Sequence, residues 1–179
     1  MQIVSKIKSS KFVQFFASID RKISNALEYK VRYSPKLASL FILFKQLIDL
    51  IGFPVFGVLL FITAPQGNLL TGLWLTVLIL NELIVKRIFK RQRPFMFDGD
   101  WSEKSHLFGY AFPSSHAYTA GFFITVWLSL HLPYPKIMIP MFTIIPISRV
   151  VLNYHYVGDV VIGTLIGVAW AIISLGFVK

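Results

Sequence analysis

The sequence predicts an all-α membrane protein, a polytopic bundle of transmembrane helices preceded by an amphipathic helix at the membrane interface. Of the 179 residues, 55% are hydrophobic and 15% are charged, whereas a soluble domain carries about 25% charged residues. Five hydrophobic segments follow one another along the chain. The length is that of one domain, which we expect to comprise residues 1–179, with the interfacial helix in 1–33 and the five-span bundle in 34–179.

The composition also limits the possible classes of function. The chain has no cysteine, which excludes a disulfide scaffold, and its hydrophobicity excludes disorder. Lysine and arginine number 18 against 8 acidic residues, a formal charge of +10. We therefore expect an anionic partner, either lipid headgroups or a phosphorylated substrate. Nucleic acid is a poor candidate because it binds to a soluble basic surface.

Residues 9–32 predict an amphipathic helix rather than a span. Hydrophobic residues recur every three or four positions, while basic residues occupy other faces. The hydrophobic positions are Phe12, Phe15, Phe16, Ile19, Ile23 and Leu27. A basic helix of this kind is typical of the membrane interface; a soluble partner-binding helix is the alternative. It lacks the continuous apolar centre and cleavage site of a signal peptide.

The expected spans cover about 37–64, 68–86, 111–131, 136–152 and 156–178. A helix needs about 20 residues to cross a bilayer, so the fourth is short, and it contains Pro140 and Pro146. Pro54 predicts a kink in the first. Because successive spans alternate in direction, the end of the second, the start of the third, the end of the fourth and the start of the fifth meet at one membrane face.

Three polar groups of residues occur at those four helix ends. The first, Lys86–Pro94, places Lys86 and Arg93 seven residues apart, on one side of a helix. Pro94 disfavours helix at Arg93, which we expect at the frayed end. Two fixed cations on one side predict a clamp for a dianion. Flanking a span on its cytoplasmic side is the more general explanation of such basic clusters.

The second group, Phe112–His116, comes immediately before the third span. Proline and serine here favour the start of a helix, whose N-terminal N–H groups and positive dipole end suit a phosphate. We expect Ser114 and Ser115 to bind phosphate oxygens and His116 to project from the first turn. Helix capping is the alternative role for Ser114.

The third group extends from Ser148 to Asp159 and includes Arg149 and His155. Because His155 and Asp159 are four residues apart, the aspartate can orient the imidazole on one helical face. A stripe of small residues continues this face into the bundle; it consists of Gly163, Gly167 and Ala171. Two histidines and an aspartate would also suit a metal, but the surrounding cations favour phosphate, so we expect neither a metal nor another cofactor.

The three groups together resemble the signature of the type-2 phosphatidate phosphatase superfamily. In this sequence the signature consists of Lys86-x6-Arg93-Pro94, Pro113-Ser114-Ser115-His116 and Ser148-Arg149-x5-His155-x3-Asp159. The one departure is Ser115, where the family usually has glycine. The backbone N–H at this position is retained, so the departure leaves the expected site unchanged.

The resemblance implies a phosphatase that needs no metal. His155 would be the nucleophile that forms a phosphohistidine, Asp159 would hold its other ring nitrogen, and His116 would protonate the leaving oxygen and then activate water. Charge on the phosphate oxygens would be stabilised by the remaining motif residues, namely Lys86, Arg93, Ser114, Ser115 and Arg149.

The resemblance also implies a phosphorylated membrane lipid as substrate, entering sideways from the bilayer. We expect lipid A 1-phosphate, with phosphatidylglycerophosphate or undecaprenyl diphosphate as alternatives. A lipid phosphotransferase and a non-enzymatic lipid-binding bundle are further alternatives. We expect no obligatory protein partner.

Two arguments about the membrane face of the active site disagree. The positive-inside rule places the cation-rich face in the cytoplasm, whereas bacterial relatives act on the outer face of the inner membrane. We follow the resemblance and expect a multi-pass protein of the bacterial inner membrane with a periplasmic active site. Arg87, Lys90 and Arg91 are expected to hold anionic headgroups, and His106 to be an ordinary loop residue, with a lid as its alternative role.

Overall fold

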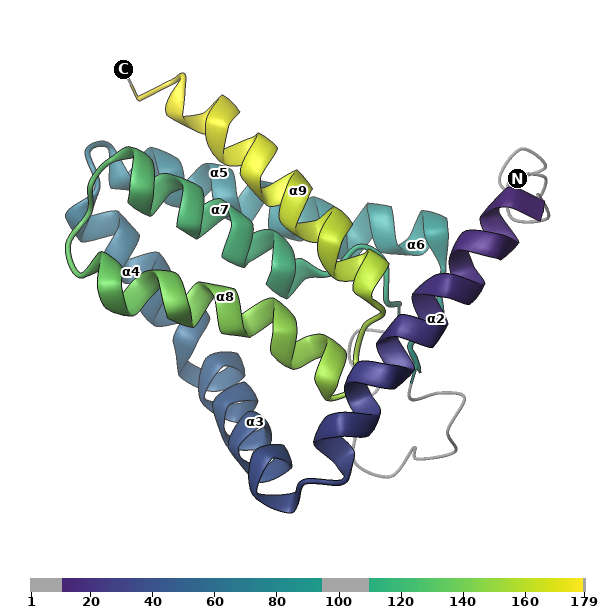
Figure 1. Ribbon diagram of the computed structural model, residues 1–179. Helices are drawn as coiled ribbons and strands as arrows, with labels where there is room; N and C mark the ends of the chain where they lie inside the picture. Colours follow the sequence, from purple (N-terminus) through teal and green to yellow (C-terminus); the bar gives the residue numbers. More distant parts are fainter. Residues whose placement is uncertain (1–10, 95–109, 179) are drawn as a thin grey trace.

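All regular secondary structure in the described residues, 11–94 and 110–178 of this computed structural model, is helical (Figure 1). His106 and the first two residues of the expected amphipathic helix lie outside these ranges. The elements are α2 (Lys11–Arg32), α3 (Pro35–Leu47), η1 (Ile48–Gly52), α4 (Phe53–Thr63), α5 (Gly67–Leu80), η2 (Asn81–Val85), α6 (Lys86–Phe89), α7 (Ser115–Ser129), α8 (Pro135–Val151) and α9 (Val157–Leu175).

Within the described residues, three helices are long and apolar enough to cross a membrane. They are Pro35–Thr63, which joins α3, the π-helical turn η1 and α4; Gly67–Phe89, which joins α5, η2 and α6; and α9. They correspond to the first, second and fifth expected spans. Pro54 lies in the first turn of α4, directly after the π-helical turn, where its missing N–H is tolerated.

The third and fourth expected spans are both helical. Helix α7 is shorter than the 111–131 expected for the third span, whereas α8 has the short length expected for the fourth. Helix α7 has 15 residues and α8 has 17; at a rise of about 1.5 Å per residue, both are shorter than a bilayer core of about 30 Å. Helix α7 begins only at Ser115 because residues 110–114 form an irregular segment. Most of α7 is buried inside the bundle. Because other helices surround it, its length need not equal the thickness of the bilayer core.

The core forms around α7, which packs against α8 and α9. Aromatic rings from four helices meet there, with Phe56 and Phe142 at 4.7 Å and Trp74 and Phe123 at 5.1 Å between ring centroids. These spacings are typical of edge-to-face aromatic packing. The aromatic core fixes the positions of α4, α5, α7 and α8 relative to one another.

The small-residue stripe of α9 lies against α7, as predicted. A Cβ at Gly167 would come within 2.0 Å of the Tyr118 carbonyl oxygen, and one at Gly163 within 2.4 Å of the Ser114 carbonyl oxygen. Gly121 of α7 approaches the backbone of Thr164 in the same way. The two backbones are therefore in direct contact, and this contact places the start of α9 beside the start of α7.

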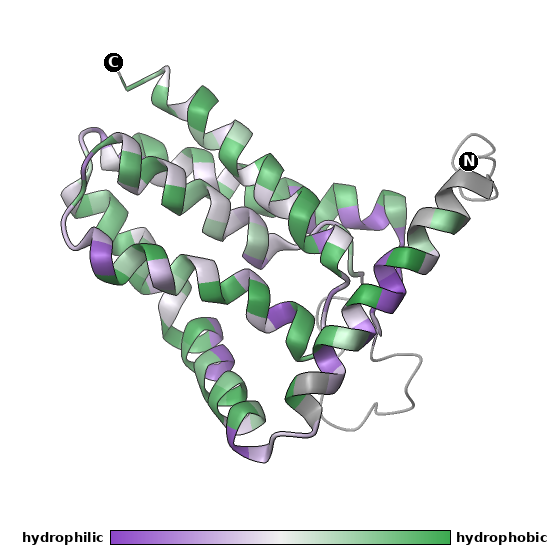
Figure 2. Cartoon of the chain, viewed as in Figure 1, coloured by the Kyte–Doolittle hydropathy of each residue, from purple (hydrophilic) through white to green (hydrophobic). Residues whose placement is uncertain are grey.

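Helix α2 confirms the predicted amphipathic helix and crosses the bundle near the start of α9 and the end of α8 (Figure 1). Its apolar positions Ile19, Ile23 and Leu27 are exposed. Figure 2 shows hydrophilic residues on α2 and around α6, whereas the long helices are mainly hydrophobic. The polar end of the bundle thus coincides with the end that α2 covers.

Candidate active site

The predicted site residues converge at the polar end of the bundle, where α6 and α8 end and α7 and α9 begin. Five of them are almost entirely buried, with relative exposures of 0–4%: Lys86, Ser114, Arg149, His155 and Asp159. A direct link between two of the helix ends is the hydrogen bond from the Ser114 N–H to the Asp159 carbonyl oxygen, at 3.1 Å. The expected meeting of these helix ends is confirmed.

Lys86 and Arg93 come together in a different way from the one predicted. Helix α6 ends at Phe89, and Lys90 takes a left-handed conformation with φ of 48°, so Arg93 follows the helix instead of lying on one side of it. The helical i, i+7 argument is therefore wrong, yet the turn still brings the charge of Arg93 close to Lys86. The Lys86 ammonium donates to Glu82 Oε1 at 2.5 Å.

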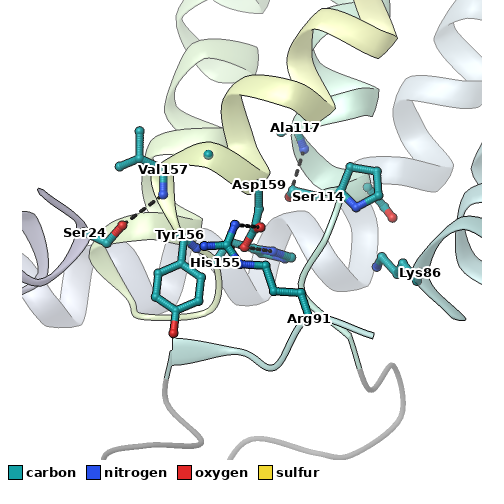
Figure 3. Close-up of polar contacts among 12 residues, drawn as sticks. Ser24, Lys86, Arg91, Ser114, Ala117, His155, Tyr156, Val157 and Asp159 are labelled. Carbon is teal, nitrogen blue, oxygen red and sulfur yellow. Dashed lines mark hydrogen bonds and ion pairs between the residues drawn. The ribbon is translucent and has the colours of Figure 1, made fainter. Parts of the chain in front are cut away.

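The start of α7 holds both motif serines. Ser114 is the N-cap, and its Oγ accepts a hydrogen bond from the Ala117 N–H at 3.4 Å (Figure 3); the capping alternative is thus observed. Ser115 Oγ donates to Glu82 and accepts from Asn81 Nδ2 at 2.8 Å. The π-helical turn η2 therefore holds Lys86 and Ser115 through one carboxylate, a contact that sequence reasoning missed.

His116 and Arg149 share a carboxylate from the first long helix. Asp49 Oδ1 lies 2.9 Å from His116 Nε2 and accepts from the Arg149 guanidinium at 2.6 Å. Lys45, one helical turn before Asp49, also pairs with it at 2.9 Å. The position of Asp49 between these two motif residues was not predicted from the sequence.

His155 lies in the connection before α9 and not on the helix itself. Its Nδ1 is 3.7 Å from Asp159 Oδ2, and it has no hydrogen-bond partner among the described residues. The expectation that one helical face carries both residues is wrong, because α9 begins only at Val157. The aspartate still faces the imidazole, since Asp159 Oδ2 accepts from the Tyr156 N–H at 3.0 Å across the first turn.

The environment of His155 favours its neutral form. Burial lowers the pKa of the imidazole to about 4, and the positive charges of Arg93 and Lys86 act in the same direction, while Asp159 opposes them. A neutral imidazole has a lone pair available for attack on phosphorus. The cations that suit a phosphate thus also keep the candidate nucleophile unprotonated.

Arg91 is part of the site, contrary to the expectation that it binds headgroups. One guanidinium nitrogen donates to Asp159 Oδ1 and the other to Asp20 Oδ2 of α2, both at 2.6 Å. Figure 3 shows Arg91 beside the ring of Tyr156 and the Asp159 carboxylate. Asp20 and Arg91 lacked any motif or spacing that could have indicated this contact.

No group of three or more histidine, cysteine, aspartate or glutamate side chains suited to hold a metal occurs in the described part of the chain. The carboxylates of the site pair with lysine, arginine and histidine instead. This donor set suits an anion with negative oxygens better than a divalent cation.

Comparison with known proteins identifies the family. The model of the PAP2 superfamily matches residues 66–179. The chain belongs to the PAP2 superfamily. The match includes all three polar groups of the predicted signature, and the predicted resemblance is confirmed. Family membership supports an enzyme of the phosphatase class, a hydrolase.

A solved structure supports the same fold for this PAP2 protein. It is the crystal structure of the first transmembrane PAP2 type phosphatidylglycerolphosphate phosphatase from Bacillus subtilis, with a TM-score of 0.67 and 23% sequence identity over 98% of this chain and 90% of that one. No curated protein matches the chain. With the three candidate membrane-spanning helices, this likeness indicates a multi-pass membrane protein.

Proposed function

We propose that this PAP2 protein is a membrane lipid phosphatase that needs no metal and acts through a phosphohistidine. The observation that carries the proposal is His155, which is 2% exposed, faces Asp159 and lies within the influence of Lys86 and Arg93. A buried neutral imidazole among fixed cations suits in-line attack on a phosphate, because the cations stabilise the charge that the transition state spreads over the oxygens.

The proposed reaction has two steps. In the first, His155 Nε2 attacks phosphorus, the bond from phosphorus to the lipid oxygen breaks, and that oxygen takes a proton from His116. In the second, water gives a proton to His116 and attacks phosphorus, the phosphorus–nitrogen bond breaks, and inorganic phosphate leaves. Asp159 stabilises the positive charge on His155 in both steps.

The amide and guanidinium groups of the site are proposed to bind the phosphate oxygens. Ser114 and Ser115 lie at the N-terminus of α7, where backbone N–H groups and the helix dipole attract an anion. Arg149 is buried and supplies a guanidinium from the end of α8. Lys86 and Arg93 complete the set from the segment that follows α5.

For the substrate we propose phosphatidylglycerophosphate, or a lipid with the same phosphate monoester, ahead of lipid A 1-phosphate. The solved relative of the same fold is described as a phosphatidylglycerolphosphate phosphatase, which favours this alternative over the substrate first expected. Undecaprenyl diphosphate and a phosphotransferase reaction remain the other candidates. We propose the bacterial inner membrane as the location, with the active site on the periplasmic face.

The test is phosphate release by the full-length protein in lipid nanodiscs, with EDTA present. The panel contains phosphatidylglycerophosphate, lipid A 1-phosphate and undecaprenyl diphosphate, each without an acceptor lipid. We expect release with the first substrate and none from His155→Ala, while His131→Ala, which changes an exposed histidine of the turn after α7, retains activity. Rapid alkaline quenching, followed by detection of a base-stable, acid-labile phosphate label on His155, would detect the phosphohistidine.

Each result has a defined meaning. Loss of activity in EDTA, or full activity of His155→Ala, would overturn the proposed mechanism. Preference for lipid A 1-phosphate would overturn the substrate assignment alone. Lipid binding without turnover by the wild type would favour a binding protein over an enzyme, and phosphate transfer only when an acceptor lipid is added would favour a phosphotransferase.

A further inference from the structure

Asp20 of the interfacial helix shares one arginine with Asp159. The Arg91 guanidinium donates to Asp159 Oδ1 through one terminal nitrogen and to Asp20 Oδ2 through the other, both at 2.6 Å. It also lies 4.2 Å from the centre of the Tyr156 ring. The rigid planar fork of arginine, held at both nitrogens and on one face, fixes the distance between the two carboxylates.

The second oxygen of Asp20 binds the first turn of α9. Asp20 Oδ1 accepts from the Gly158 N–H at 2.8 Å, and Ser24 Oγ accepts from the Val157 N–H at 3.0 Å. These N–H groups belong to the helix start, which has no intrahelical acceptors for them and carries the positive end of the helix dipole. Helix α2 therefore caps α9 from outside, one turn from the proposed nucleophile.

Gly158 permits this close approach. A Cβ at this position would lie 2.8 Å from Asp20 Oδ2 and 3.3 Å from its Cγ. Any larger residue would push the Asp20 side chain away from the start of α9. The sequence thus combines a carboxylate on α2 with the absence of a side chain on α9 at the point where they meet.

The arrangement divides the two oxygens of Asp159 between two tasks. Oδ1 binds Arg91, and Oδ2 accepts from the Tyr156 N–H and faces His155 Nδ1 at 3.7 Å. Asp159 is fully buried, whereas the Asp20 side chain is 15% exposed. If Asp20 were neutral, Arg91 would keep only the Asp159 carboxylate of the two that it now binds. It would then attract Asp159 more strongly, away from the imidazole.

We propose that Asp20 and Arg91 are positioning residues that set the Asp159 carboxylate against His155, so that the interfacial helix α2 is part of the active-site architecture. This inference rests on the proposed phosphohistidine chemistry. Arg91 and Asp20 act through Asp159 and do not contact the substrate. Their effect therefore falls on the chemical step more than on lipid binding.

The test is a double-mutant cycle on the full-length protein in nanodiscs with phosphatidylglycerophosphate. Asp20→Asn and Arg91→Gln are each expected to lower kcat by about 10- to 100-fold, the size usual for residues that orient a reacting group, with KM changed by less than about threefold. Because both act through one contact, the double variant is expected to lose no more than Arg91→Gln alone. The matched control is Glu28→Gln, a carboxylate-to-amide change on the same helix, expected to retain wild-type kcat.

Two further variants keep the test decisive if Asp20→Asn folds poorly. Gly158→Ala removes no polar group but displaces Asp20, and is expected to lower kcat in the same way. Asp20→Glu retains the charge and is expected to be more active than Asp20→Asn.

The outcomes separate this inference from the proposed function. If the wild type releases phosphate through His155 but Asp20→Asn behaves like Glu28→Gln, the positioning role is overturned and the enzyme assignment stands. Multiplicative losses in the double variant, or an increase in KM at constant kcat, would also overturn the positioning role. No turnover by the wild type would instead contradict the proposed function.

Discussion

The Asp49 carboxylate lies 2.9 Å from His116 Nε2, although the two residues are 67 positions apart in the chain. Asp49 comes from the π-helical turn in the first long helix, and His116 from the first turn of α7. The same carboxylate oxygen accepts from Arg149. Burial and the charge of Arg149 lower the pKa of His116 to about 3, whereas Asp49 acts in the opposite direction. A carboxylate beside an imidazole orients the ring and stabilises its protonated form, so Asp49 is the group that favours the acid form of His116.

This contact predicts that Asp49→Asn weakens protonation of the leaving oxygen. The loss of kcat is expected to be about 100-fold for a lipid alkoxide, which needs a proton, and much smaller for p-nitrophenyl phosphate, whose leaving group does not. The ratio of the two rates is the measurement. Glu28→Gln should leave this ratio unchanged, and an equal loss with both substrates would argue that Asp49 serves only to hold Arg149.

The sequence predicted the parts of this site that depend on residues close together in the chain, but not the contacts between residues far apart in the chain. Ser114, His116, Arg149, His155 and Asp159 were expected together because short motifs place them at helix ends, and alternating spans bring those ends to one face. Their carboxylate partners were not expected. Asp20 reaches Arg91 across 71 positions and Asp49 reaches Arg149 across 100, and no periodicity in the sequence records such pairings.

Local geometry was also less predictable than the order of elements. Lys90 ends α6 in a left-handed conformation, where glycine or asparagine is usual, so the sequence favoured helix through Arg93. The start of α9 was placed correctly within a residue, yet His155 lies before it. We predicted a helix from His155 to Asp159 from their four-residue spacing alone. The capped start of α9 also brings the Asp159 carboxylate to face the His155 ring, without His155 being part of the helix.

The environment of His155 predicts activity at low pH. Its pKa is lowered by burial to about 4 from the ordinary 6.5, so the neutral nucleophile predominates above about pH 4 and is lost only as the pH falls through that value. We expect kcat/KM, after correction for the ionisation of the substrate measured by ³¹P NMR, to show no decline from pH 7 to about pH 5. His155 stays neutral over this range, and the acid form of His116, whose pKa burial lowers to about 3, increases as the pH falls. A decline centred near pH 6.5 would contradict this environment.

The contact between α7 and α9 predicts strong position dependence of glycine substitutions. Gly167→Ala would place a Cβ 2.0 Å from the Tyr118 carbonyl oxygen, so we expect a loss of about 3 kcal/mol or more of stability, because the backbone atom cannot move aside. Gly72→Ala is the matched control, since no atom lies within 4 Å of its Cβ, and helix propensity predicts a gain of about 1 kcal/mol. Thermal unfolding in nanodiscs measures both, and similar stabilities would argue against the close packing.

The two ends of the first long helix allow the sidedness of the site to be measured. The chain has no cysteine, and the helix Pro35–Thr63 separates Lys36, near α2 and the polar end, from Gln66 in the turn at its other end. If the site faces the periplasm, Lys36→Cys reacts with an impermeant thiol reagent in intact cells, whereas Gln66→Cys reacts only after permeabilisation. Both positions are exposed, so a difference in labelling between them shows on which side of the membrane each lies and does not arise from burial in the protein. The reverse pattern would place the active site in the cytoplasm, as the positive-inside rule suggests.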